Sequence, residues 1–330
     1  MGRRDVAVVG VNSLRVGAIF PGQGSQLLGM GVDVAQRYPA AAELFERAEK
    51  ILGYDLLALQ REGPEERLRE TQYSQPAIFV TNLALASAVR GLVPQLVATA
   101  GHSFAEFCSL VVAGAISFEN ALRVVDERGK AMSAAAAAAP GGMSAILGLD
   151  AVAVRSVTDA TQARTRLRVS PANFNAPAQI VISGDLEAVV AAGEAALAAG
   201  AKRVVPLNVS GAWHSALMEP AVERFQRAVA AASFGMPERI DVISNVDAKP
   251  YRSTEEMRTN LVASIVHEVR WHETAIRLLD CKLDLVVEFG ASAVLAPMMK
   301  RMPNAPEVIA VNDAAGIERL EARLLSEVGA

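Results

Sequence analysis

The spacing of hydrophobic positions along the chain predicts an α/β protein. Apolar runs of strand length at 16–20 and 96–101 are each broken by a glycine-containing turn, and apolar residues with helical spacing follow. The same spacing predicts further strands at 241–246, 283–290 and 306–312, and helices at 40–52, 75–93, 105–116, 222–232 and 259–269. Strands that alternate with helices in this way are typical of α/β enzymes.

A second pattern occupies the middle of the chain. Alanines fill 134–139 and run into Pro140-Gly141-Gly142, which predicts a helix end followed by a hinge. The elements expected beyond the hinge are strand 143–149, helix 151–160, strands 167–175 and 179–184, helix 185–200 and strand 203–210. This βαββαβ order is that of a ferredoxin-like module. We therefore predict a small ferredoxin-like subdomain at 141–206. It is inserted in a larger α/β domain at 15–140 and 207–330, and 1–14 form an N-terminal extension.

Composition places the chain among ordinary globular proteins. Of its 330 residues, 52% are hydrophobic and 21% are charged, which excludes a disordered or fibrous protein. The net charge of −4 gives no basic footprint for nucleic acid, so no nucleic-acid partner is expected. Cys108 and Cys281 lie in apolar surroundings without metal-ligand spacing, so we expect buried free thiols and no metal site.

The sequence predicts no association with a membrane. No apolar run approaches the ~20 residues that a helix needs to cross a bilayer. The opening segment MGRRDVAVVG has only a short apolar stretch and lacks the core and cleavage site of a signal peptide. We therefore expect a cytoplasmic protein.

The first candidate for chemistry is Gly101-His102-Ser103-Phe104-Ala105. A serine at the tip of a strand-to-helix turn has its hydroxyl held out of the sheet, and the amide of the next residue points toward the developing oxyanion. The pattern is that of a nucleophile turn in an α/β-hydrolase-like domain, although Ala105 stands where the motif usually has glycine. Such a turn can also be purely structural. The apolar strand before it and the helix after it favour a nucleophilic Ser103 with Phe104 as amide donor.

A glycine-containing loop follows the first strand, with the sequence FPGQGSQ at 20–26. Its two glycines allow a tight turn and a close approach of the backbone to a ligand. A dinucleotide fingerprint would need another glycine where Leu27 stands, and no Gly-Lys-Ser/Thr follows for a phosphate loop. The loop is then either a plain turn or, through Gln23, a source of an oxyanion donor.

His214 is the candidate for a general base. It follows a strand and a Ser-Gly break, from which an imidazole can project into a cleft. A lone histidine is more often a packed structural residue, and we expect that of the other three histidines. Spacing reveals no acid for a triad, so Asp241 and Asp247 are both open as a third member, or neither is.

Arg128 lies on a helix that is expected to start near the nucleophile helix. The planar guanidinium of arginine binds carboxylates through two hydrogen bonds, which lysine cannot imitate. A surface salt bridge with Asp126 or Glu127 is the alternative.

Seven segments of the chain, taken in order, closely resemble the malonyl-CoA:acyl carrier protein transacylase family, which includes discrete acyltransferases of polyketide synthases. They are FPGQGSQ, GHSFAE, ERGKAM, ANFNAPAQIVISG, VSGAWHSALM, SNVDA and EFGASAVLAPMMKR. The resemblance runs over nearly the whole chain from about Val16.

The resemblance implies the catalytic residues by position. Ser103 would be the nucleophile and His214 the general base. The amides of Gln23 and Phe104 would form the oxyanion hole. In this family a backbone carbonyl orients the histidine in place of a carboxylate, and Ser264 holds that position here.

The resemblance also implies the residues that bind substrate. Arg128 would hold the free carboxylate of a malonyl-type acyl group, and Gln75 and Asn175 would line the acyl pocket. Trp213 stands where the family has a smaller residue, so its ring should shorten the pocket and disfavour α-branched acyl groups.

The implied reaction moves a malonyl-type acyl group from coenzyme A to the phosphopantetheine thiol of an acyl carrier protein, in fatty acid or polyketide biosynthesis, with no metal or organic cofactor. An acyl hydrolase of the same fold, releasing acyl groups from carrier proteins, would use the same residues. A non-catalytic subunit that only docks carrier proteins is a third reading, prompted by Ala105 and by Ser264 and Glu268, which replace a typical glutamine and proline. Basic residues that could meet the carrier protein are Arg155, Lys202, Arg203, Lys300 and Arg301.

Overall fold

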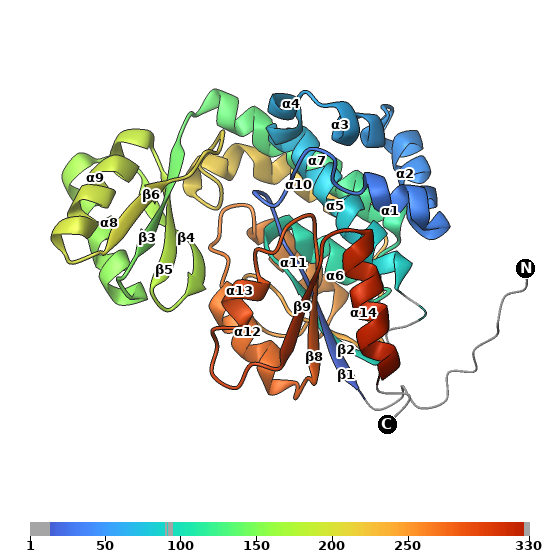
Figure 1. The fold of residues 1–330 in the computed structure, drawn as a ribbon. Coiled ribbons are helices and arrows are strands. Elements are labelled where there is room, and N and C mark those ends of the chain that lie inside the picture. Colours follow the sequence, from blue (N-terminus) through green and yellow to red (C-terminus); the bar gives the residue numbers. More distant parts are fainter. Residues whose placement is uncertain (1–13, 90, 92–94, 327–330) are drawn as a thin grey trace, which may run out of the picture.

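A computed structural model describes residues 14–89, 91 and 95–326, and a five-stranded parallel sheet lies at its centre (Figure 1). The strands are β1 (Arg15–Phe20), β2 (Gln95–Gly101), β7 (Asp241–Val242), β8 (Leu285–Phe289) and β9 (Glu307–Val311). They lie in the order β7-β2-β1-β8-β9, and each neighbouring pair is parallel. Because the strands are parallel, their carboxyl ends meet at one edge of the sheet, where α/β proteins place their sites.

Helices cover both faces of this sheet, because its strands are apolar on both sides. Along β1, Ala18 and Phe20 face one core and Ile19 faces the other. The helices that share the first core include α2 (Pro39–Leu52), α5 (Thr71–Ala88), α6 (Glu106–Val112) and α14 (Ala314–Ser326). Those of the second are α12 (Trp271–Asp280) and α13 (Ala296–Met299). The other helices of this part are α1 (Val32–Arg37), α3 (Leu56–Glu62), α4 (Glu65–Arg69), α7 (Phe118–Ala138), α10 (Glu219–Ala231) and α11 (Thr254–Ala263).

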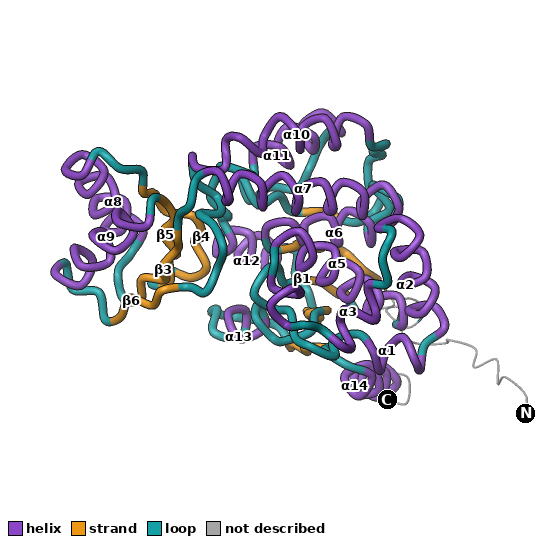
Figure 2. The backbone as a smooth tube through the Cα atoms, turned by 90° about the horizontal axis from the view of Figure 1, so that it is seen from above, coloured by secondary structure: helices purple, strands orange, loops and turns teal. Residues whose placement is uncertain are grey.

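A separate antiparallel sheet forms a small subdomain to one side of the parallel sheet (Figures 1 and 2). Its elements are β3 (Gly142–Leu147), α8 (Ala151–Thr165), β4 (Val169–Ala176), β5 (Gln179–Gly184), α9 (Leu186–Ala198) and β6 (Arg203–Pro206). The strand order is β4-β5-β3-β6, and both helices pack on one core with this sheet. Helix α7 leads into the subdomain, and α10, which packs on α7, follows it.

The predicted α/β fold with a separate small sheet is confirmed, but several predicted elements prove too long. The helices expected at 75–93 and 259–269 end at Ala88 and Ala263, and the strand expected at 203–210 ends at Pro206. The strand expected at 241–246 ends at Val242, because the chain turns back where Ser244 N–H donates to the Lys249 carbonyl. The helix expected at 105–116 ends at Val112, since Gly114 follows with φ 75°. Of the predicted N-terminal extension, residues 1–13 lie outside the described residues. In the described part of the chain, no helix is both long and apolar enough to span a bilayer.

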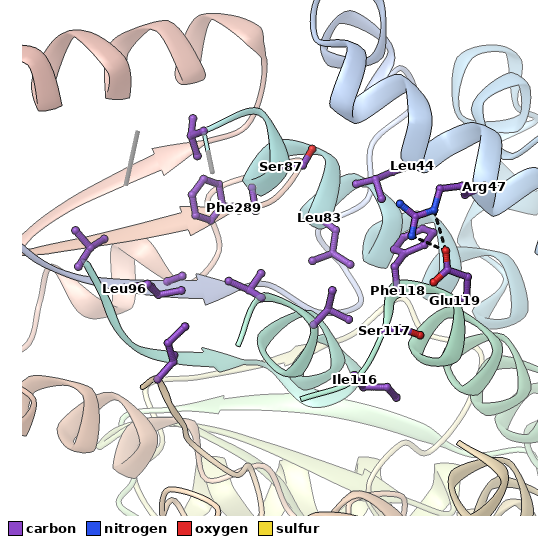
Figure 3. A pocket seen from close by; sticks show the side chains of 17 residues that line it. Leu44, Arg47, Leu83, Ser87, Leu96, Ile116, Ser117, Phe118, Glu119 and Phe289 are labelled. Atoms are coloured by element: carbon purple, nitrogen blue, oxygen red, sulfur yellow. Dashed lines mark hydrogen bonds and ion pairs between the residues drawn. The ribbon is translucent and has the colours of Figure 1, made fainter. Parts of the chain in front are cut away.

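An apolar cavity of about 590 Å³ lies between the parallel sheet and its helices (Figure 3). Val16 and Leu96 line it from β1 and β2, Phe289 lines it from the end of β8, and an ion pair of Arg47 with Glu119 lies at one side. None of the predicted site residues is among its described lining residues. The cavity is therefore distinct from the candidate site.

Candidate active site

Ser103 lies on a tight turn between β2 and α6. Its φ of 58° is in the left-handed region, and the 3-10 turn Ser103–Ala105 carries the chain directly into the helix. Gly101 permits this turn, because a Cβ built on it would lie 2.0 Å from the Ala105 carbonyl oxygen. Ala105 is fully buried, so the methyl group in place of the usual glycine hydrogen is accommodated. The sequence GHSFA therefore forms the sharp turn that its pattern predicts.

Replacing Gly101 by alanine is expected to destabilise the protein by about 2 kcal/mol or more, because the new methyl group would overlap backbone atoms that cannot move independently. Denaturant unfolding measures the change. Gly235→Ala is the matched control, since a Cβ there meets nothing within 4 Å. Equal stability of the two variants would contradict this reading of the turn.

Ser103 and His214 are brought together from distant parts of the chain. The Ser103 Oγ lies 2.8 Å from Nε2 of His214. On the other side of the ring, Nδ1 lies 2.8 Å from the carbonyl oxygen of Ser264 and 3.1 Å from that of His267. Two carbonyl acceptors require the proton on Nδ1, which leaves Nε2 free to accept the proton of Oγ. The second carbonyl, from His267, was not foreseen in the sequence.

Neither aspartate considered as a third member contacts His214. Asp241 pairs with Arg252, and Asp247 accepts from the Lys249 amide. Within the residues that the structure describes, Nδ1 of His214 is therefore oriented by main-chain oxygens and by no carboxylate. Burial lowers the pKa of His214 to about 3, and the neighbouring positive charge of Arg128 lowers it in the same direction. The ring is neutral at neutral pH, as a proton acceptor must be.

Arg128 is buried beside the serine, with 1% of its surface exposed. Its Nη2 donates to Ser103 Oγ at 3.2 Å, its Nη1 donates to Gln75 Oε1 at 3.0 Å, and its Nε has no hydrogen-bond partner among the described residues. The surface salt bridge considered as an alternative is absent: among the described residues, Asp126 pairs with Lys130.

The other candidate acid, Glu127, pairs with Arg224, and no described carboxylate lies within ion-pair distance of Arg128. Burial lowers the pKa of the Arg128 guanidinium to about 9, while the more distant charge of Glu106 opposes this shift. The site thus holds a buried positive charge that has no counter-ion in the described part of the chain.

One face of α7 continues from Arg128 toward Trp213. Met132, one turn further along, lies on the same face, and its sulfur is 3.6 Å from Gln75 Nε2. One more turn along the helix, the Cβ of Ala136 lies beside Gly211. A Cβ built on Gly211 would meet this alanine at 2.7 Å and the Trp213 ring at 2.6 Å. Gln75 is therefore adjacent to Arg128. The Trp213 ring is buried near the far end of this face, and its effect on acyl size stays a prediction.

The loop that follows β1 reaches the serine turn. A Cβ built on Gly22 would lie 2.5 Å from the His102 carbonyl oxygen, so only glycine allows this approach. Gln23 comes next, and its Nε2 donates to Thr71 Oγ1 at 3.0 Å, which anchors the loop. Phe104 is buried directly after the serine. The two segments expected to supply oxyanion donors are thus neighbours.

Asn175 connects the small subdomain to this turn. It lies on β4, and its Oδ1 is 3.0 Å from Nε2 of His102. The adjacent Phe174 N–H donates to the Val269 carbonyl at 2.9 Å. Asn175 therefore contacts the residue before Ser103. Burial lowers the pKa of His102 and this hydrogen bond raises it, with a net decrease.

Sequence reasoning missed three buried polar residues around the turn: Glu106, Asn245 and Tyr251. Burial raises the pKa of the Glu106 carboxyl to about 7, against the opposing effect of hydrogen bonds from Tyr251 and Asn245. The available signal was an acidic residue on the apolar helix after the serine. Of the two thiols expected to be buried, Cys108 is buried but Cys281 is partly exposed.

Comparison with known proteins identifies the family. A model of the acyl transferase domain matches residues 18–319. The malonyl CoA-acyl carrier protein transacylase of Salmonella typhimurium is 39% identical over 302 residues, 91% of this chain and 96% of that protein. The polyketide biosynthesis protein ThaF of Burkholderia thailandensis is 41% identical over 288 residues, which cover 86% of this chain and 24% of that protein.

A solved structure gives the same answer. A malonyl-transacylase in complex with a type II polyketide synthase acyl-carrier protein has a TM-score of 0.88 to this structure. The two share 39% sequence identity over 94% of this chain and 99% of that one. On sequence and fold together, the chain belongs to the malonyl-CoA:acyl carrier protein transacylase family of acyltransferases.

Proposed function

We propose that this protein transfers a malonyl-type acyl group from coenzyme A to the phosphopantetheine thiol of an acyl carrier protein, through an ester on Ser103. In this proposal His214 is the general base and the amides of Gln23 and Phe104 bind the oxyanion. Arg128 binds the free carboxylate of the acyl group.

The observation that carries this proposal is the buried guanidinium of Arg128. An unpaired charge in the interior costs of the order of several kcal/mol, and a substrate carboxylate would supply the missing partner. The unpartnered Nε is a further donor for it. Because Nη2 lies 3.2 Å from Ser103 Oγ, the carboxylate and the reacting carbonyl must be close together in the substrate. Malonyl, with one methylene between them, meets that requirement.

The proposed reaction has two mirrored halves. Ser103 Oγ forms a bond to the thioester carbon while its proton passes to His214 Nε2, and the two amides stabilise the oxyanion, each by ~100-fold or more in rate. The carbon–sulfur bond then breaks, and the coenzyme A thiolate takes the proton from His214. In the second half the carrier thiol gives its proton to His214 and attacks the ester, and Ser103 regains its proton as the thioester forms.

Timed intact-protein mass spectrometry with malonyl-CoA tests the proposal. We expect a persistent malonyl adduct on Ser103 that disappears when a phosphopantetheine-bearing carrier protein is added, with malonyl-carrier as product. Rapid formation of free malonate without a carrier would instead support the acyl hydrolase. Absence of any adduct or turnover would support a docking subunit without catalysis.

The acid limb of the pH profile is expected below the usual imidazole range, because burial and Arg128 hold the pKa of His214 at about 3. A base of ordinary pKa, about 6.5, would lose roughly tenfold in rate at pH 5.5. We expect less than about a twofold loss in the rate constant for Ser103 malonylation between pH 7 and 5.5. Quenched-flow mass spectrometry measures it, and a tenfold loss would show that the ring titrates normally.

The carrier protein is proposed to approach across exposed basic side chains. Arg155, one of the residues predicted for this role, pairs with Glu268. The remaining four are exposed: Lys202, Arg203, Lys300 and Arg301. No bound cofactor is needed in this proposal, because the serine carries the acyl group itself. A cytoplasmic location is part of the same proposal.

A further inference from the structure

We propose that Asn245 is a positioning residue that fixes the distance between Ser103 and His214 by holding the backbone beside each of them. This inference rests on the proposed roles of the two residues as nucleophile and base. Asn245 lies in the turn after β7 and is 2% exposed. It contacts neither reacting atom, so its effect passes through the main chain.

The side-chain amide of Asn245 holds both ends of the serine turn. Its Oδ1 accepts from the Ser103 N–H at 3.0 Å, and its Nδ2 donates to the Gly101 carbonyl at 2.9 Å. The left-handed backbone of Ser103 costs an L-residue about 1–2 kcal/mol, so the turn needs an outside partner to persist. Because the Ser103 amide is committed to Asn245, the amide left in this turn for an oxyanion is that of Phe104.

The main chain of Asn245 holds the segment that orients the base. Its carbonyl oxygen accepts from the Arg270 N–H at 3.0 Å. The segment that ends at Arg270 carries the carbonyl groups of Ser264 and His267, which lie against Nδ1 of His214. One residue is therefore bonded to the nucleophile turn through its side chain and to the base-orienting segment through its backbone.

Two buried residues hold Asn245 in turn. Its backbone N–H donates to Glu106 Oε2 at 3.1 Å, and its Nδ2 also contacts that oxygen. The Tyr251 hydroxyl donates to Glu106 Oε1. Glu106 is 2% exposed and Tyr251 is 3% exposed, and burying a carboxylate at this depth is tolerated because it accepts several hydrogen bonds. The amide of Asn245 therefore has one well-defined orientation.

Asn245→Ala tests the proposal, with Asn260→Ala as the matched control. Asn260 also reaches this turn, through a hydrogen bond to Ser244 Oγ, but it does not contact the serine turn. Ser103 reactivity is measured with malonyl-CoA and, separately, with a fluorophosphonate. With the latter, Oγ forms a bond to phosphorus, fluoride leaves and the Oγ proton passes to His214.

We expect the rate constant for Ser103 to fall about 100-fold with both reagents in Asn245→Ala, as a small misplacement of reacting groups would cause. The KM for malonyl-CoA should stay within about twofold, because Arg128 is untouched. The endpoint of fluorophosphonate labelling counts folded sites, so the rate constant is reported per folded protein. Asn260→Ala should react within about twofold of the unaltered chain.

Rates for Asn245→Ala within about threefold of the unaltered chain would overturn the proposal. If Asn245→Ala fails to fold, Tyr251→Phe is used instead, because it removes only one hydroxyl that holds Glu106. We expect this variant to lower the rate constant about tenfold. An unchanged rate in Tyr251→Phe would also overturn the proposal. An unaltered chain that reacts with the fluorophosphonate but not with malonyl-CoA would refute the proposed function alone, since the fluorophosphonate rates still decide the role of Asn245.

Discussion

Replacing Ser103 by alanine is expected to abolish the covalent malonyl adduct and to lower malonyl transfer by about 10⁴-fold or more. The reason is the geometry of the turn: Ser103 Oγ lies 2.8 Å from the imidazole and 3.2 Å from the guanidinium, so no other hydroxyl occupies its place. Intact-protein mass spectrometry after exposure to malonyl-CoA detects the adduct, and formation of malonyl-carrier protein measures transfer.

Ser87→Ala is the control for removal of a serine hydroxyl. Ser87 lies on α5 beside the apolar cavity, where its hydroxyl donates to the Ala84 carbonyl. This variant should form the malonyl adduct at the rate of the unaltered chain. A malonyl adduct that persists in Ser103→Ala would assign the nucleophile to another residue.

Replacing Arg128 by methionine is expected to lower the rate of malonylation about 100-fold, from the loss of a buried charge pair worth ~3 kcal/mol in the bound state. Acetylation from acetyl-CoA should change much less, since an acetyl group has no carboxylate to bind. In the absence of substrate, the variant should be more stable by about 1 kcal/mol or more, because an unpaired buried charge is replaced by a side chain of similar length. Competition between malonyl-CoA and acetyl-CoA, together with denaturant unfolding, measures both effects.

Two further variants separate charge from geometry. Arg128→Lys keeps a positive charge but lacks the planar fork that reaches Gln75 and Ser103 at once, so we expect intermediate malonylation. Arg123→Met removes an exposed arginine from the same helix and should leave malonylation and stability unchanged. An equal fall in malonyl and acetyl loading in Arg128→Met would mean that this side chain does not select the acyl group.

The strand and helix pattern was predictable because it is local. Apolar runs of strand length and helical spacing depend only on nearby residues, and they yielded β1, β2, β8 and β9 with small errors at the ends. The serine turn was predictable for the same reason, since Gly101, Ser103 and Ala105 interact with one another within five positions. The errors fell where a turn cut an apolar run short, as it does after Val242.

The sequence by itself determined the elements, the serine turn and the family to which the chain belongs. The family resemblance implied that the Ser264 carbonyl orients His214, but only the tertiary structure added the carbonyl of His267, because every residue has a carbonyl group and such an acceptor leaves no mark in the sequence. The tertiary structure also decided that Arg128 forms no ion pair with its neighbours on α7. Which residues pair depends on the face of the helix that each occupies, and Asp126 pairs with Lys130. The Ser103 N–H donates to Asn245, 142 positions further along the chain. A pattern of neighbouring residues cannot predict this contact, because only folding brings the two segments together.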